Sequence, residues 1–224
     1  MPMSYTAVIA VKNGIEYIDF AIESIEKQSF QPAKIIVIDD NSSDLTFTHI
    51  SKKYKHIELL KSPYSGQQLA LSYALGIVKS EYVAFLDADD YWDNDKQIVQ
   101  LATLEENPEI DVVCSGTRNF LNSKSDKLDF SQNTKEFKES RQFSACTFRT
   151  TVFAEKFPLT KKIGHFQWQI SWWANAIDKG LKYQQTGKVQ LNRRVHSENS
   201  WVTDTSIGTR QLFEFLRLHK GQNK

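Results

Sequence analysis

Three carboxylates within four residues directly follow a run of apolar residues in this chain. The run from Tyr82 to Leu86 predicts a buried strand, and Asp87, Asp89 and Asp90 come immediately after it. Open α/β folds place their ligands at the carboxyl ends of such strands. Carboxylates this close together repel one another, and a bound divalent cation would offset that repulsion. The pattern therefore favours a cation and ligand site, and a solvated acidic turn that caps the next helix is the alternative.

A second acidic turn ends an earlier buried strand, where KIIVI at residues 34–38 leads into Asp39 and Asp40. Strand and helix patterns alternate throughout the first half of the chain. Strands are expected at 5–11, 34–38, 57–60, 82–86 and 111–115, and helices at 15–28, 44–54, 67–78 and 94–106. This alternation predicts a mostly parallel, doubly wound α/β sheet. Because the carboxyl ends of parallel strands lie side by side, we expect both acidic turns to converge on one crevice.

The second half of the chain is less regular. Residues 121–141 predict a loop or hairpin, 167–179 a tryptophan-rich helix, 181–191 one or two strands, and 205–220 a terminal helix. Trp168 and Trp172 fall on one helix face and are expected in the core, with stacking on a ligand as the alternative. A length of 224 residues fits one domain, so we expect a single domain over 1–224 with halves 1–116 and 117–224.

Composition narrows the classes of partner. The formal net charge of +1 gives no sign of a nucleic-acid partner, and no apolar run is long enough for a membrane span. The N-terminal residues lack a secretory pattern, and Cys114 and Cys146 are predicted to be reduced, buried thiols. These features predict a cytoplasmic protein. The predicted terminal helix at 205–220 has basic residues beside apolar ones. Its apolar residues could pack on the core, form a homodimer contact or lie on the inner face of a membrane.

The order and spacing of four motifs resemble the family 2 glycosyltransferases of the GT-A fold. The motifs are VIAVKN at 8–13, SIEKQ at 24–28, IIVIDDNS at 35–42 and EYVAFLDADDYW at 81–92. The resemblance implies a Rossmann-like three-layer α/β sandwich with a mostly parallel central sheet. It further implies inverting, metal-assisted transfer of a sugar from a nucleoside-diphosphate donor, with a UDP-sugar expected first. The expected acceptor is a hydroxyl group of a glycan or lipid-linked sugar, with residues 1–116 binding the donor and 117–224 the acceptor.

The resemblance also implies roles for particular residues. Asp40 would accept the uracil N3–H, Asp87 would face the ribose or the donor sugar, and Asp89 would bind Mg²⁺ or Mn²⁺ on the diphosphate. A buried base N–H needs an acceptor, and a departing diphosphate needs its growing charge neutralised, so these roles are physically reasonable. The remaining nucleotide-sugar candidates are Ala10, Lys12, Ala88 and Arg194. His196 is a further candidate metal or phosphate ligand, and an exposed basic loop is the alternative for the segment that contains it.

Two departures from the family pattern concern the chemistry. The family's habitual arginine after the third loop falls here on Leu71, and Lys12 is a candidate replacement. The carboxylate that serves as catalytic base falls on Gln169, which cannot take a proton, and no Asp or Glu lies between Glu155 and Asp178. His165 is the candidate base in that interval, since histidine titrates near neutral pH. The alternative function is a catalytically impaired nucleotide-sugar-binding homologue that acts as partner of another transferase.

Overall fold

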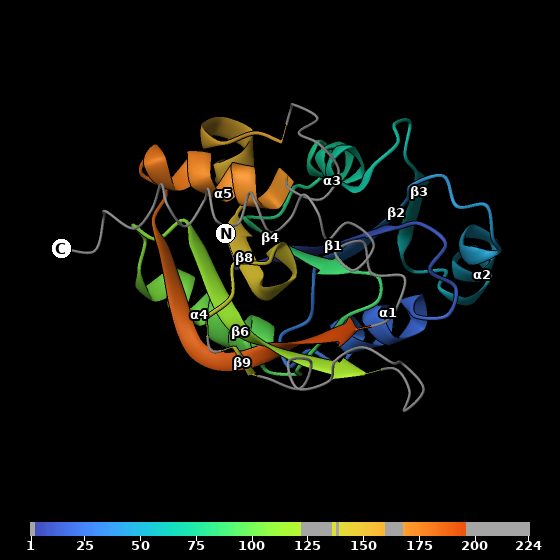
Figure 1. The fold of residues 1–224 in the computed structure, drawn as a ribbon, viewed down its shortest axis with the longest axis horizontal. Helices are drawn as coiled ribbons and strands as arrows, with labels where there is room; N and C mark the ends of the chain where they lie inside the picture. The colour runs from blue at the N-terminus through green and yellow to red at the C-terminus, as the bar shows by residue number, and fades with distance from the viewer. Residues whose placement is uncertain (1–2, 122–135, 138, 160–167, 196–224) are drawn as a thin grey trace.

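The computed structural model describes residues 3–121, 136–137, 139–159 and 168–195. Within these residues one mixed sheet of nine strands forms the centre of the molecule, with the strand order β3-β2-β1-β4-β8-β6-β9-β5 and with β7 paired to β6. Figure 1 shows α3 and α5 on one side of this sheet and α1 and α4 on the other. The result is the three-layer α/β arrangement that the sequence predicted. No helix among the described residues is long and apolar enough to cross a membrane.

The parallel part of the sheet closely follows the sequence prediction. Its strands are β1 (Tyr5–Val11), β2 (Lys34–Asp39), β3 (Glu58–Lys61) and β4 (Tyr82–Asp87). The helices between them are α1 (Ile18–Glu26), α2 (Thr46–Lys53) and α3 (Gln67–Leu75). β1 pairs in parallel with β2 on one side and with β4 on the other. All seven residues of β1 are therefore buried, which explains why its sequence is apolar apart from Thr6.

The remaining elements extend the sheet with strands of both directions. They are β5 (Tyr91–Trp92), α4 (Lys96–Glu106), β6 (Val112–Leu121), β7 (Glu136–Phe137), β8 (Cys146–Arg149), α5 (Trp168–Asp178) and β9 (Tyr183–Val195). β8 was not predicted. It lies antiparallel between β4 and β6, so the fifth predicted strand, β6, does not neighbour β4 directly. The predicted terminal helix at 205–220 lies outside the described residues.

The tryptophan-rich helix packs into the core. Trp168, Trp172 and Trp173 are buried on α5, and Phe143 lies 4.9 Å and 5.0 Å from the first two rings. The preferred core interpretation of these tryptophans is thus confirmed. The segment that carries Phe143 is a short 3₁₀ turn, Phe143–Ala145, which leads into β8. Its position matters because it also lies against the end of β4.

A lysine lies in the core below this turn. Lys96 is fully buried, and its Nζ lies 3.0 Å from Gln100 Oε1 and 4.3 Å from the centroid of the Trp92 ring. The free thiols of Cys114 and Cys146 are buried nearby, with their Sγ atoms 2.9 Å apart. Burial lowers the pKa of Lys96 from its ordinary 10.5 to about 7, although the neighbouring thiols act in the opposite direction. The amine is therefore easily deprotonated in the folded state.

This burial predicts a pH-dependent stability. Between pH 7 and 10.5 the unfolded chain holds a proton on Lys96 and the folded chain does not, so the free energy of unfolding rises with pH in this window. Relative to Lys96→Met, wild type should gain up to about 1.4 kcal/mol per pH unit. Urea unfolding of both proteins at pH 7 and pH 9 measures the difference. A constant difference across that interval would show that Lys96 keeps its ordinary pKa.

Candidate functional site

The two acidic turns meet at the carboxyl ends of the parallel strands. We call this part of the molecule, which contains Asp39, Asp40, Asp87, Asp89 and Asp90, the acidic edge. β1 lies between β2 and β4, and its last residues pair Ala10 with Asp87 and Val11 with Asp39. The chain continues from β2 into Asp40, whose N–H donates to the carbonyl oxygen of Val11 at 2.7 Å. The predicted convergence is therefore confirmed: Asp39 and Asp40 follow β2 and Asp87 ends β4, the two parallel strands that flank β1.

Asp40 is held by the loop before α3. Both of its carboxylate oxygens lie 2.9 Å from the Gly66 nitrogen, whose N–H they accept, and the side chain is only 5% exposed. Gly66 has a φ of +109°, a conformation that a side chain would strain. A carboxylate has about four lone-pair positions, so one N–H leaves Asp40 able to accept another donor. The geometry gives a fixed, nearly buried acceptor at the sheet edge.

The first residue of α3, Gln67, binds the other acidic turn. Gln67 Nε2 donates to Asp87 Oδ1 at 2.7 Å, and the Asp87 N–H donates to Ser144 Oγ at 3.0 Å. Burial and the neighbouring charge of Asp89 raise the pKa of Asp87 to about 6, while Ser144, Arg193 and Gln67 act against the rise. Gln67 of α3 therefore orients the Asp87 carboxylate. The raised pKa means that this carboxylate is readily protonated when no cation or additional hydrogen-bond donor lies beside it.

Asp90 and Arg194 join the acidic turn to β9. Asp90 Oδ1 accepts the N–H of Arg194 at 2.9 Å, and Arg194 Nε donates to the carbonyl oxygen of Asp89 at 3.0 Å. Asp90 is 3% exposed, and its burial together with the charges of Asp89 and Asp87 raises the pKa of its carboxyl well above the usual range. The Asp90 carboxylate thus anchors β9. Among the described residues it accepts its hydrogen bond from this strand, and not from the helix that follows the turn.

The guanidinium of Arg194 lies among aromatic rings. It is 4.9 Å from the Tyr17 centroid, 5.1 Å from that of Phe20 and 4.7 Å from that of Phe120. Cation–π contacts of this kind stabilise a partly desolvated arginine. Arg194 is 5% exposed, so its predicted contact with phosphate stays a prediction. His165 and His196 lie outside the described residues, and their predicted roles are likewise untested.

The turn after β1 contributes backbone to the same edge. Lys12 is exposed, and Asn13 Oδ1 accepts the Ser43 N–H at 2.8 Å, which ties this turn to the turn after β2. A Cβ on Gly14 would come within 2.6 Å of Val11 Cγ2 and 3.6 Å of Ala88 Cβ. The glycine therefore allows the β1 turn to pack against the acidic turn. Ala88, predicted near the ligand, lies at this contact, and Ala10, predicted there as well, precedes Val11 in β1.

Gln169 lies close to the acidic edge. Its Oε1 accepts the Phe143 N–H at 3.1 Å, and the next residue, Ser144, contacts Asp87. Gln169, which occupies the position expected for the catalytic base, is thus close to the site. Its side-chain amide supports the 3₁₀ turn at Phe143–Ala145. Leu71, where the family arginine was expected, is 3% exposed within the core.

The carboxylates of the acidic turn suit a metal ion that is also bound by the phosphates of a ligand. No group of three or more His, Cys, Asp or Glu among the described residues is arranged to hold a metal ion by itself. Mg²⁺ is commonly held by one or two carboxylates together with substrate phosphates, and Asp89 with the oxygens of a diphosphate would fit that pattern. The sequence reasoning missed Gln67, Ser144 and Arg193, because a single glutamine, serine or arginine gives no signal until the fold places it beside Asp87.

Comparisons with known proteins agree with this fold. The sequence model of the family described as Glycosyl transferase family 2 matches residues 6–169. WfaP of Escherichia coli is 29% identical over 200 residues, covering 85% of this chain and 76% of WfaP. TuaG of Bacillus subtilis, described as a putative teichuronic acid biosynthesis glycosyltransferase, is 35% identical over 98 residues, covering 42% of this chain and 39% of TuaG.

Two solved structures share the fold at low sequence identity. TarS 1-349 of S. aureus in complex with UDP-GlcNAc has a TM-score of 0.65 at 19% identity and covers 96% of this chain and 65% of that one. Glucosyl-3-phosphoglycerate synthase of Mycobacterium tuberculosis with Mn²⁺, UDP and phosphoglyceric acid has a TM-score of 0.66 at 14% identity, covering 96% and 78%. This chain thus spans about two thirds of the TarS chain.

The fold is that of the GT-A glycosyltransferases. Because the family match extends over most of its length, the chain belongs to glycosyl transferase family 2. The resemblance and fold class predicted from the sequence are confirmed.

Proposed function

We propose that the protein transfers a sugar from a UDP-sugar to a hydroxyl group of a glycan or lipid-linked acceptor, with metal assistance and inversion at the anomeric carbon. The convergence of Asp40, Asp87 and Asp89 at one sheet edge carries this proposal. Residues 1–116 would bind the donor and residues 117–224 the acceptor. Family membership favours a transferase over the alternative of an inactive binding partner.

Each carboxylate has a distinct part in the proposal. Asp40, fixed by the Gly66 N–H, accepts the uracil N3–H, with Ala10 and Lys12 beside the base. Asp87, oriented by Gln67, faces the ribose or the donor sugar. Asp89 would hold Mg²⁺ or Mn²⁺ on the diphosphate, with Arg194 and His196 as further candidates there. A bound metal would neutralise the charge that develops on the departing diphosphate.

The names of relatives support the choice of substrates. WfaP is described as a UDP-Glc:alpha-D-GlcNAc-diphosphoundecaprenol beta-1,3-glucosyltransferase, and AmsB of Erwinia amylovora as an amylovoran biosynthesis glycosyltransferase. The TarS structure holds UDP-GlcNAc and the mycobacterial synthase holds Mn²⁺ and UDP. We infer a UDP-sugar donor, a divalent cation and an acceptor from the class of surface polysaccharides or their lipid-linked precursors.

Inversion requires a base for the acceptor proton. The acceptor oxygen forms a bond to the anomeric carbon while the bond from that carbon to the diphosphate breaks, and the hydroxyl proton must move to a nearby group. The Gln169 amide cannot accept this proton and already accepts the Phe143 N–H. We therefore keep His165 as the proposed base.

A donor panel tests the proposed function. UDP-, GDP- and dTDP-sugars are incubated with Mn²⁺ and a broad set of saccharide acceptors, and the release of nucleoside diphosphate is measured for wild type and His165→Ala. We expect turnover with a UDP-sugar and a loss of roughly 100-fold or more in His165→Ala. Donor binding without turnover across the whole panel would overturn the transferase assignment in favour of a binding partner.

A further inference from the structure

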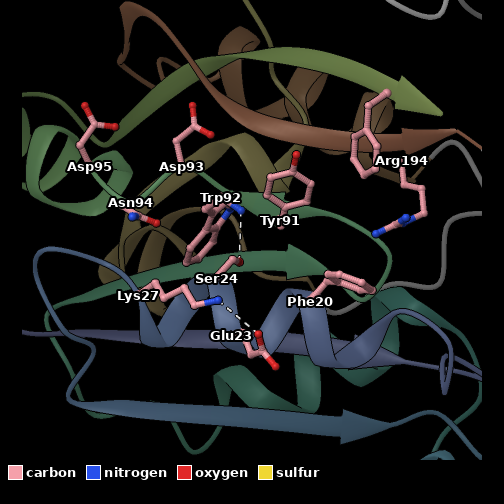
Figure 2. Close-up of a pocket in the computed structure, with 11 residues that line it drawn as sticks. Phe20, Glu23, Ser24, Lys27, Tyr91, Trp92, Asp93, Asn94, Asp95 and Arg194 are labelled. Atoms are coloured by element: carbon pink, nitrogen blue, oxygen red, sulfur yellow. Dashed lines mark hydrogen bonds and ion pairs between the residues drawn. The ribbon is translucent and has the colours of Figure 1, made fainter. Parts of the chain in front are cut away.

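A groove beside the acidic edge is lined by residues from both halves of the chain. Its volume is about 830 Å³, within the range of about 300–1,000 Å³ that is usual for ligand sites. Figure 2 shows Phe20 and Glu23 of α1, with Lys27 just after this helix, on one side of the groove and Tyr91, Asp93 and Arg194 on the other. Since Arg194 Nε binds the Asp89 carbonyl oxygen, one end of the groove adjoins the proposed donor site.

Aromatic faces line the end of the groove near Arg194. Phe20 is 57% exposed, so much of its ring is open to a ligand, and its centroid lies 5.1 Å from the Arg194 guanidinium. The half-buried Tyr91 and Phe120 lie opposite, with ring centroids 5.1 Å apart. No hydrogen bond of the Tyr91 hydroxyl or the Asn94 side-chain amide is present within the described part of the chain. Aromatic faces with free hydrogen-bonding groups suit a ligand that has both C–H faces and hydroxyls.

Two carboxylates at the other end are fixed by amides of β9. Asp93 Oδ1 accepts from Asn192 Nδ2 at 2.7 Å, and Asp95 Oδ1 accepts from Gln190 Nε2 at 2.9 Å. These bonds use one oxygen of each carboxylate and hold the side chain. The second oxygen of Asp95 lies 3.5 Å from Lys188 Nζ, whereas the second oxygen of Asp93 is oriented in advance for a hydroxyl donor. Such preorganisation reduces the entropy lost on binding.

The charges of the groove disfavour an anionic ligand. Glu23, Asp93 and Asp95 contribute three carboxylates, against the cations Lys27 and Arg194. Lys27 pairs with Glu23 at 3.2 Å, and Arg194 is engaged with Asp89 and the aromatic rings. Lys188 lies 3.5 Å from Asp95 and Lys53 lies 3.7 Å from Glu23, so the charges of the groove are largely paired with one another. A phosphate-rich ligand would have to displace these pairs. A neutral chain of hydroxyl-bearing rings meets stacking faces and acceptors instead.

We propose that this groove is a binding site for a neutral oligosaccharide, namely the distal sugars of the acceptor glycan, whose reacting end would be bound by residues 117–224. The acceptor role rests on the proposed function, whereas binding of the oligosaccharide does not. The residues proposed to contact the oligosaccharide are Phe20, Tyr91, Asp93, Asn94 and Asp95.

Saturation-transfer NMR on the full chain, without nucleotide or metal, tests the site. The probes are cellotetraose, laminaritetraose, chitotetraose and mannotetraose. We expect at least one to bind, and Phe20→Ala to weaken that binding about three- to tenfold through loss of ring stacking. Asn94→Ala should weaken it as well without risk to the fold, because the Asn94 side chain is exposed and bonds nothing among the described residues. Ile98→Ala, 44% exposed on α4 outside the groove, is the control and should bind as wild type does.

The outcomes separate this inference from the proposed function. Binding of none of the four probes, or equal affinity of wild type, Phe20→Ala and Asn94→Ala, would overturn the site. Oligosaccharide binding by wild type that is weakened in Phe20→Ala and Asn94→Ala, together with no transfer by wild type from any donor of the panel, would support the groove and count against the transferase assignment alone.

Discussion

Asp89→Asn is expected to reduce sugar transfer by about 100- to 1,000-fold, because the amide cannot hold the cation that neutralises the departing diphosphate. The effect should appear mainly in kcat and in the dependence on Mn²⁺ concentration. Uracil recognition by Asp40 is separate, so the affinity for uridine alone should not change. Steady-state release of UDP across a Mn²⁺ titration measures these quantities.

The variant should remain folded, which makes the result interpretable. The charge of Asp89 raises the pKa of both Asp87 and Asp90, so its removal relieves repulsion within the turn. The thermal midpoint is therefore expected to be unchanged or higher. Asp178→Asn, an exposed carboxylate at the end of α5, is the matched control and should keep wild-type activity. Undiminished, Mn²⁺-dependent transfer by Asp89→Asn would remove Asp89 from the metal site.

Asp40→Asn is expected to weaken UDP binding about 10- to 100-fold. The buried acceptor of the uracil N3–H is replaced by a group that also carries an NH₂, and a mismatched buried hydrogen bond costs about 1–3 kcal/mol. Cytosine presents an acceptor at N3 rather than an N–H, so the variant should discriminate less strongly between UDP and CDP. Calorimetric titration of both nucleotides with wild type and Asp40→Asn measures the change.

The same substitution should leave the loop before α3 in place. Asparagine keeps one oxygen that can accept the Gly66 N–H, which both Asp40 oxygens accept at 2.9 Å in wild type. Stability close to that of wild type is therefore the expected control result. An unchanged preference for UDP over CDP in a stable Asp40→Asn protein would mean that another residue recognises the base.

The parallel part of the fold could be predicted because its signals are local. Buried strands such as β1 and β4 are almost entirely apolar runs, and the acidic residues directly follow them. Since parallel strands align their ends, the convergence of Asp39, Asp40 and Asp87 follows from the strand order alone.

The antiparallel additions depend on contacts between distant residues, and no local pattern indicates them. β8 has four residues and pairs with β4 and β6, which lie far away in the sequence. Gln67, Ser144 and Arg194 likewise acquire partners only when α3, the 3₁₀ turn and β9 reach the acidic edge. The sequence placed Arg194 near phosphate, whereas the structure shows the contacts that bury it: the Asp89 carbonyl oxygen and the aromatic rings.

A crystal structure with UDP and Mn²⁺ bound would test the central claim most directly. We predict that the uracil N3–H donates to the Asp40 carboxylate beside Gly66. We also predict that Mn²⁺ lies on Asp89 and on oxygens of the diphosphate, with Asp87 facing the ribose side. UDP bound away from the edge formed by β1, β2 and β4, or a diphosphate with Mn²⁺ that Asp89 does not contact, would contradict the account.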